Sequence, residues 1–165
     1  MQVKLVEDTG NVTIEKDGEG FVICIDSRVR VNVTKPELKL MHALIGALLT
    51  EKTGSDKGAL KKLVMETLST NKARFQDVLR KMKAEDTAFV VWYCGDVRTT
   101  QEILKNMSKR AADDVQDTVR ETIERRIRKE RSEGNQSFEK EMDDYGRCTV
   151  MNMLKQVLDS DNLPI

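Results

Sequence analysis

The chain has 165 residues, of which 34% are charged and 4% are aromatic, and its 28 basic residues are balanced by 28 acidic ones. This length can bury one good core or two small ones, and zero net charge excludes a global field that would draw the protein to nucleic acid or to an anionic membrane. The three cysteines lack the spacing of a metal site, no apolar run approaches the ~20 residues that cross a bilayer, and the first residues do not form a secretion signal. We therefore expect a cytoplasmic protein with reduced thiols and without membrane insertion.

Residues 1 to 33 predict a small antiparallel sheet. Apolar and polar residues alternate from Val12 to Ile14 and again from Val29 to Val33, and the turn-forming segment Asp17–Gly20 precedes the apolar run Phe21–Ile25. The sequence thus indicates a meander of three or four short strands, with Phe21–Ile25 as its most buried member. A sheet this small is not stable alone and needs a cover.

The segment after the sheet predicts a helix that covers it. Thr34 and Glu37 have the spacing of a capping box, and the apolar residues from Leu38 to Leu49 form one broad stripe. Turn-forming residues follow this helix before helical periodicity resumes. We therefore divide the chain into a sheet-plus-helix module at residues 1–52 and an all-helical domain at residues 58–165, which together make an α+β fold.

The second module predicts helices only. They are expected at residues 59–68, 72–83, 86–94, 97–107, 109–132 and 138–160. The fifth begins at Ser108, an acceptable N-cap, and carries apolar residues at a spacing of four as far as Ile127. An apolar stripe this narrow rotates around a straight helix, so the second half of the helix is expected to leave the other helices and project from them. Gly134 ends this helix, and the sixth is expected to fold back antiparallel upon it.

Two motifs in the helical module resemble a known family. They are Gln76-x-x-Leu79-Arg80 and Leu104-x-Asn106-Met107-Ser108-Lys109-Arg110-Ala111-Ala112-Asp113, with Asp86 and Gly95 between them. Through these residues the chain resembles the stator-facing C-terminal domain of the bacterial flagellar motor switch protein FliG. The resemblance covers about residues 58–119, is weaker as far as residue 160 and does not extend to residues 1–52. It implies an armadillo-like helical domain.

The resemblance also implies a surface that binds a protein partner, a component of a motor or of another large assembly. In the family, charged residues meet oppositely charged residues of the ion-driven stator. Arg110 matches the arginine of the Asn-Met-Ser-x-Arg motif, and Asp117 falls where the family has the first of two acidic residues. The chain departs from the family at Cys94, where a lysine is expected, and at Thr118, which replaces the second acidic residue. The implied partner-binding residues are Arg110, Asp113, Asp114, Asp117 and Arg126.

A nucleic-acid-binding accessory protein is the alternative function. Arg28 and Arg30 alternate with valines on the sheet, and the basic run Arg120–Arg131, which includes Arg125 and Arg128, offers cations for phosphates. However, glutamates stand four residues before Arg125 and Arg128, which is the favourable order for ion pairs within a helix. A solvated, self-paired helix is therefore the simpler interpretation of the basic run.

The sequence offers little for catalysis. It contains no nucleophile paired with a base, no plausible zinc-binding set and no glycine-rich phosphate cradle. Neighbouring carboxylates such as Asp143 and Asp144 point apart on a helix and usually only hydrate its surface. We therefore predict a non-enzyme without a cofactor, and keep a small phosphate-using enzyme as a third hypothesis. The sequence is also compatible with an oligomer.

Overall fold

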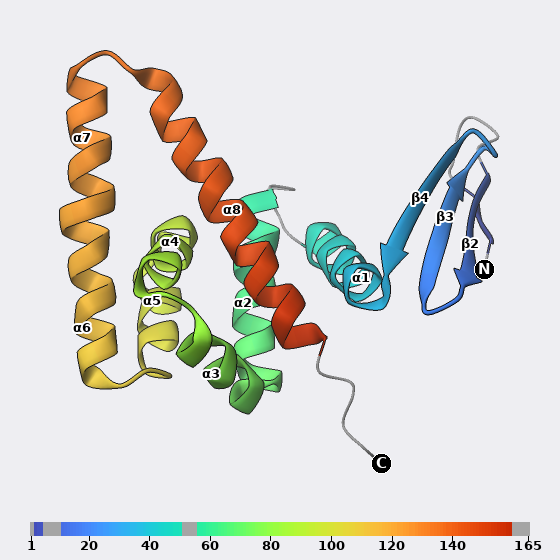
Figure 1. The fold of residues 1–165 in the computed structure, drawn as a ribbon, viewed down its shortest axis with the longest axis horizontal. Helices are drawn as coiled ribbons and strands as arrows, with labels where there is room; N and C mark the ends of the chain where they lie inside the picture. Colours follow the sequence, from blue (N-terminus) through green and yellow to red (C-terminus); the bar gives the residue numbers. More distant parts are fainter. Residues whose placement is uncertain (1, 5–10, 51–55, 160–165) are drawn as a thin grey trace.

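The computed structural model describes residues 2–4, 11–50 and 56–159 and confirms an α+β fold (Figure 1). A four-stranded antiparallel sheet comes first in the chain, and helices follow it. The strands lie in the sheet in their order along the chain, as β1 Gln2–Lys4, β2 Asn11–Asp17, β3 Gly20–Ile25 and β4 Val29–Thr34. The predicted meander is therefore confirmed for the described residues, and β3 contributes the buried residues Val22 and Ile23.

Helix α1, Lys35–Thr50, begins at the predicted capping box. The backbone N–H of Thr34 donates to Glu37 Oε2 at 2.8 Å, and the N–H of Glu37 donates to Thr34 Oγ1 at 3.4 Å. This reciprocal pair satisfies two donors at the helix start. Although α1 contacts β3 and β4, its buried residue Leu40 belongs to the core of the helical part, where α2 (Asp56–Thr70) and α8 (Gln136–Leu158) are its main neighbours. Lys155 Nζ on α8 donates to Glu37 Oε1 at 2.7 Å and ties α8 to the start of α1.

The helical part is built around α4 and α8. The helices after α1 are α2 Asp56–Thr70, α3 Lys72–Lys81, α4 Ala84–Cys94, α5 Val97–Leu104, α6 Lys109–Asp117, the π-helical segment η1 Thr118–Glu124, α7 Arg125–Ser132 and α8 Gln136–Leu158. Helix α4 is buried at almost every position from Thr87 to Cys94 because other helices surround it. The division of the chain between residues 52 and 58 stays a prediction, and residues 51–55 lie outside the described ranges.

Helix α8 crosses α4 at a glycine. A Cβ atom on Gly146 would lie 3.0 Å from Tyr93 Cβ, so the two helices approach as closely as they do because position 146 has no side chain. Helix α8 also contacts α1, α2, α3 and α7, so it is a central element in the packing of the helices. Within the described residues, no helix has both the length and the apolar character that a membrane span requires.

Helix α6, η1 and α7 form one continuous rod, as the sequence predicts for residues 109–132 (Figure 1). The apolar stripe does not rotate away from the core as the sequence predicts: Val115, Ile123 and Ile127 are all buried. Residues four apart advance by about 40° around an α-helix, whereas a π-helical turn holds more residues and rotates them back. The π-helical segment η1 therefore keeps the apolar stripe on one face. Helix α7 extends past α4 and packs against α8, which returns antiparallel after Gly134.

Candidate protein-binding groove

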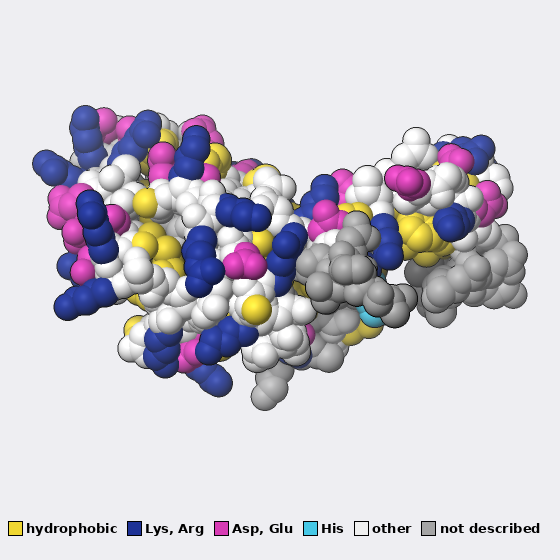
Figure 2. All heavy atoms as spheres, turned by 60° about the horizontal axis from the view of Figure 1, so that its bottom comes forward, with side chains coloured by type: hydrophobic (Ala, Val, Ile, Leu, Met, Phe, Trp, Pro, Cys, Tyr) yellow, Lys and Arg dark blue, Asp and Glu magenta, His cyan; other side chains and the backbone are white. Residues whose placement is uncertain are grey.

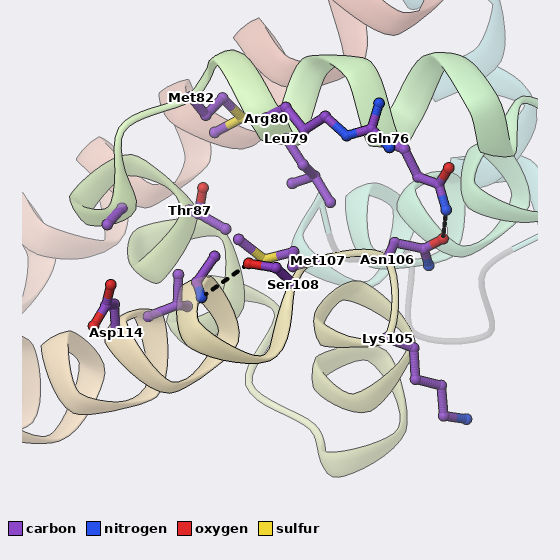
Figure 3. Close-up of a pocket in the computed structure, with 13 residues that line it drawn as sticks. Gln76, Leu79, Arg80, Met82, Thr87, Lys105, Asn106, Met107, Ser108 and Asp114 are labelled. Atoms are coloured by element: carbon purple, nitrogen blue, oxygen red, sulfur yellow. Dashed lines mark hydrogen bonds between the residues drawn. The ribbon is translucent and has the colours of Figure 1, made fainter.

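A groove with a volume of about 610 Å³ opens between α3 and the start of α6 (Figure 3). Both motifs of the sequence resemblance line it, although they lie about thirty residues apart in the chain. The motif residues in the lining include Gln76, Leu79 and Arg80 from α3, with Asn106, Met107 and Ser108 from the turn before α6. The two segments thus form the facing walls of one site.

Hydrogen bonds fix the turn that carries the second motif. Gln76 Nε2 donates to Asn106 Oδ1 at 3.0 Å, and Asn106 Nδ2 donates to the carbonyl oxygen of Glu102 at 2.7 Å, so Asn106 joins α3 to the end of α5 (Figure 3). Ser108 is the N-cap of α6, as predicted, because its Oγ accepts from the N–H of Ala111 at 3.3 Å. The polar residues of the motif therefore hold the wall of the groove in place.

The floor of the groove is apolar apart from Thr87. Leu79, Val115 and Thr87 are buried beneath it, and the hydroxyl of Thr87 donates to the carbonyl oxygen of Lys83 at 3.2 Å. Met82 and Met107 are half-buried on opposite sides of the groove (Figure 3). Unbranched thioether side chains adapt their shape to what they contact. The groove can therefore accept an apolar side chain without a fixed outline.

The basic residues at the rim are paired within the chain. Arg80 Nη1 lies 3.3 Å from Asp77 Oδ1, and Lys105 Nζ lies 2.8 Å from Glu102 Oε1. The hydrogen bond and the charge of Lys105 lower the pKa of Glu102. These cations at the α3 and α5 side of the groove are consequently neutralised by neighbours on their own helices.

The charged residues of α6 are not paired in this way. Arg110, Asp113, Asp114 and Asp117 are all exposed, and none of them makes an ion pair with any residue in the described ranges. Their spacing of three, four and seven residues places them on one face of the helix. We name this set the α6 charged face. Asp114 also lines the groove, so the face and the groove are continuous.

Arg126, the fifth residue implied by the resemblance, lies apart from this site. Its guanidinium carbon sits 4.8 Å from the centre of the Phe138 ring, in a cation–π contact at the far end of the rod. Sixteen residues separate it from Arg110, which corresponds to roughly 24 Å along a helix. The structure therefore brings Arg110, Asp113, Asp114 and Asp117 together but not Arg126.

Three of the six basic residues in the run Arg120–Arg131 make an ion pair within the described chain. Arg125 lies 3.7 Å from Glu121, and Lys129 lies 3.9 Å from Glu133. Arg131 donates to Glu139 on α8 at 2.6 Å. The ion pair expected between Glu124 and Arg128 is not among those that the described residues form, and Arg128 is exposed.

The two arginines of the sheet are exposed, but they occupy different kinds of position. Arg30 pairs with Cys24 across β4 and β3, on the sheet face opposite to the alternating valines. Arg28 lies in the turn before β4, where its N–H donates to the carbonyl oxygen of Ile25 at 3.0 Å. The two guanidinium groups are thus not held on one regular strand surface.

Sequence reasoning missed Met82 as a groove residue. The periodicity predicts a helix as far as residue 83, but α3 ends at Lys81 and Met82 is extended, with φ −70° and ψ 147°. No glycine or proline marks this break. The one local signal is the acidic pair Glu85 and Asp86, which is typical of the first turn of a new helix and lies in the first turn of α4.

Three further residues with shifted pKa values lie in the core or cap a helix. Burial raises the pKa of the Cys94 thiol to about 12, and burial also raises the pKa of Tyr93 to about 12. Burial raises the pKa of Asp96, but hydrogen bonds from Thr99 and Lys61 outweigh it and lower the pKa overall. Asp96 is the N-cap of α5 and accepts from the N–H of Thr99 at 2.9 Å. Within the described ranges, no group of three His, Cys, Asp or Glu residues is arranged to hold a metal ion.

Comparison of the chain with protein-family models, with curated proteins and with solved structures gives no match. The resemblance to FliG therefore stays a prediction that rests on the motif residues. The geometry around Asn106 and Arg110 is consequently the basis for inferring what the protein does.

Proposed function

We propose that this protein is a non-catalytic interaction component that binds a protein partner through the groove and the α6 charged face. One observation carries the proposal: an open groove with an apolar floor adjoins four exposed charged side chains that have no ion-pair partner in the described chain. Charges that no intrachain group neutralises are free to meet charges on a partner and to steer its approach.

The charges indicate the chemistry of that partner. The α6 charged face carries three carboxylates and one guanidinium, and the exposed Lys109 beside it adds one ammonium, so the helix is still net negative, while Arg80 and Lys105 on the other rim are already paired. A complementary surface is therefore net basic and places at least one acidic group opposite Arg110. The apolar floor accepts apolar side chains from the same segment. A basic amphipathic helix, laid in the groove, fits both requirements.

We further propose that the partner belongs to a motor or to another large assembly. This part of the proposal rests on the resemblance of the Asn106-Met107-Ser108-Lys109-Arg110 segment to the stator-facing domain of FliG. Cys94 and Thr118 interrupt the family's charge pattern. We therefore propose a binding role on a similar scaffold and do not extend the proposal to the generation of torque.

Nuclear magnetic resonance of the isotope-labelled full chain tests the proposed site. The probe is a synthetic basic amphipathic helix, and the matched control is a peptide with the same apolar positions and acidic residues in place of the basic ones. The basic peptide should shift the amide signals of residues 76–82 and 106–117, and the acidic one should not. Equal shifts with both peptides, or shifts confined to α7, would contradict the proposal.

Neutralising the acidic side chains tests the role of charge. The double variant Asp114→Asn with Asp117→Asn should weaken binding of the basic peptide severalfold and reduce its dependence on salt, because charges at an interface rim act mainly through steering. Glu141→Gln is the matched control, since Glu141 is exposed on α8 away from the groove. An oligonucleotide titration at low salt tests the alternative, and binding as strong as that of the peptide would favour a nucleic-acid function.

A further inference from the structure

One face of the sheet carries apolar side chains from three strands. Val12, Ile25 and Val29 are aligned in one row and Ile14, Ile23 and Val31 in the next. Because side chains alternate between the two faces of a sheet, polar residues such as Glu15, Arg30 and Asn32 lie on the reverse. An antiparallel sheet with this alternation normally buries its apolar face against other structure.

This apolar face is open at the end of the β3–β4 hairpin. Ile25 is 38% exposed, Val29 is 50% exposed and Val31 is 43% exposed. Hydrophobic side chains gather on the sheet in the space-filling view, on the side of α1 away from the helical part (Figure 2). The predicted cover, α1, contacts β3 and β4 but packs mainly against α2 and α8. The sheet therefore has a hydrophobic surface that the described chain does not fully cover.

Helix α1 carries a second uncovered row. Met41 is 39% exposed, Ile45 is 54% exposed and Leu49 is 82% exposed. Their spacing of four places them on one side of the helix. Leu40 and Leu44 face the core of the helical part instead. The chain thus exposes both a sheet face that lacks a helix and a helix row that lacks a sheet.

We propose that two copies of this chain form a symmetric dimer in which the α1 row of each copy covers the open sheet face of the other. A two-fold interface is self-complementary: if surface A of one copy contacts surface B of its partner, then B contacts A. A second copy is the occupant that supplies both missing covers at once. None of the six exposed residues in the two surfaces is charged, so their burial places no unpaired charge in the contact.

The small size of these surfaces indicates a weak dimer. Three strands about 4.8 Å apart, with about 3.4 Å per residue, make a sheet face on the order of 300 Å², and one side of a helix about 13 Å long adds on the order of 100 Å². Two such contacts bury on the order of 800 Å² in total, which is just below the lower limit of about 1,000 Å² for a stable interface and is typical of a weak one. We therefore expect a dimer with a dissociation constant in the micromolar range.

Sedimentation of the full chain over a range of concentrations tests the dimer. The wild-type mass should rise to twice that of one chain by about 100 μM. Val31→Lys should weaken the dimer at least tenfold, and so should Ile45→Glu. Asn32→Glu is the matched control, because Asn32 is the exposed neighbour of Val31 on the reverse face, and this variant should still dimerise. A monomeric wild type at about 100 μM, or loss of the dimer in Asn32→Glu, overturns the proposal.

Mixing the two variants distinguishes the reciprocal arrangement from direct sheet-to-sheet stacking. A mixed dimer of Val31→Lys and Ile45→Glu keeps one contact intact and places lysine opposite glutamate in the other. It should therefore form when neither variant dimerises alone. Failure of the mixture to associate overturns the proposed geometry. Circular dichroism of each variant shows that it is folded, and Val29→Lys replaces Val31→Lys if the latter is not.

Discussion

The crossing of α4 and α8 predicts opposite effects for the same substitution at two glycines. Gly146→Ala places a Cβ atom 3.0 Å from Tyr93 Cβ and 3.3 Å from its Cγ, whereas a Cβ on Gly46 in α1 meets nothing within 4 Å. Both sites are helical, so each alanine gains about 1 kcal/mol of helix propensity. At Gly146 this gain is opposed by overpacking, which typically costs about 1–3 kcal/mol. Tyr93 cannot rotate away, because the crowded atoms are those nearest its backbone and the side chain is buried.

We therefore expect Gly46→Ala to raise the free energy of unfolding by about 1 kcal/mol, and Gly146→Ala to lower it by up to about 2 kcal/mol. Urea denaturation at constant pH measures both, and in a chain of this length 1 kcal/mol corresponds to about 2–4 °C in melting temperature. Gly46→Ala serves as the control for helix propensity. If Gly146→Ala stabilised the protein as much as Gly46→Ala, the close approach of α4 and α8 would not be a constraint on this fold.

Three further predictions follow from individual side chains. Hydrogen bonds from Lys155 and Thr34 lower the pKa of Glu37 from 4.5 to about 2. The contribution of the Glu37 carboxylate to stability is therefore present above pH 4.5 and is lost as the pH falls towards 2. Urea titrations across this pH window should show a smaller loss of unfolding free energy in Glu37→Gln than in the wild type. Arg110→Glu should change the free energy of unfolding by no more than about 0.5 kcal/mol, and a larger loss would show that Arg110 holds the fold. Iodoacetamide should modify exposed Cys148 in the native protein and spare buried Cys94, as peptide mapping by mass spectrometry would show, and equal modification would contradict the packing of α4.

The features that the sequence predicts well depend on residues close together in the chain. The capping box of Thr34 and Glu37 and the N-cap at Ser108 each need only a side chain and a backbone group three residues away, and both form as predicted. The fold class follows from similar local periodicity. The orientation of α1 does not, because its stripe is broad enough to face either the sheet or α2 and α8, and tertiary packing decides between them. The groove depends on Met82, where the chain leaves the helix without a breaking residue.

The π-helical segment helps explain why the structure brings Arg110, Asp114 and Asp117 together and leaves Arg126 apart. A spacing of four from Val115 to Ile127 would turn the apolar stripe by roughly 120° around a uniform α-helix. Because η1 reverses this rotation, the stripe stays buried and the whole rod remains a single straight element between the groove and Phe138. A straight rod keeps Arg110 and Arg126 far apart, and Arg126 already has Phe138 as a neighbour. A partner segment that occupies the groove can therefore reach Arg110, Asp114 and Asp117 together, whereas contact with Arg126 would require a second, separate surface on the partner.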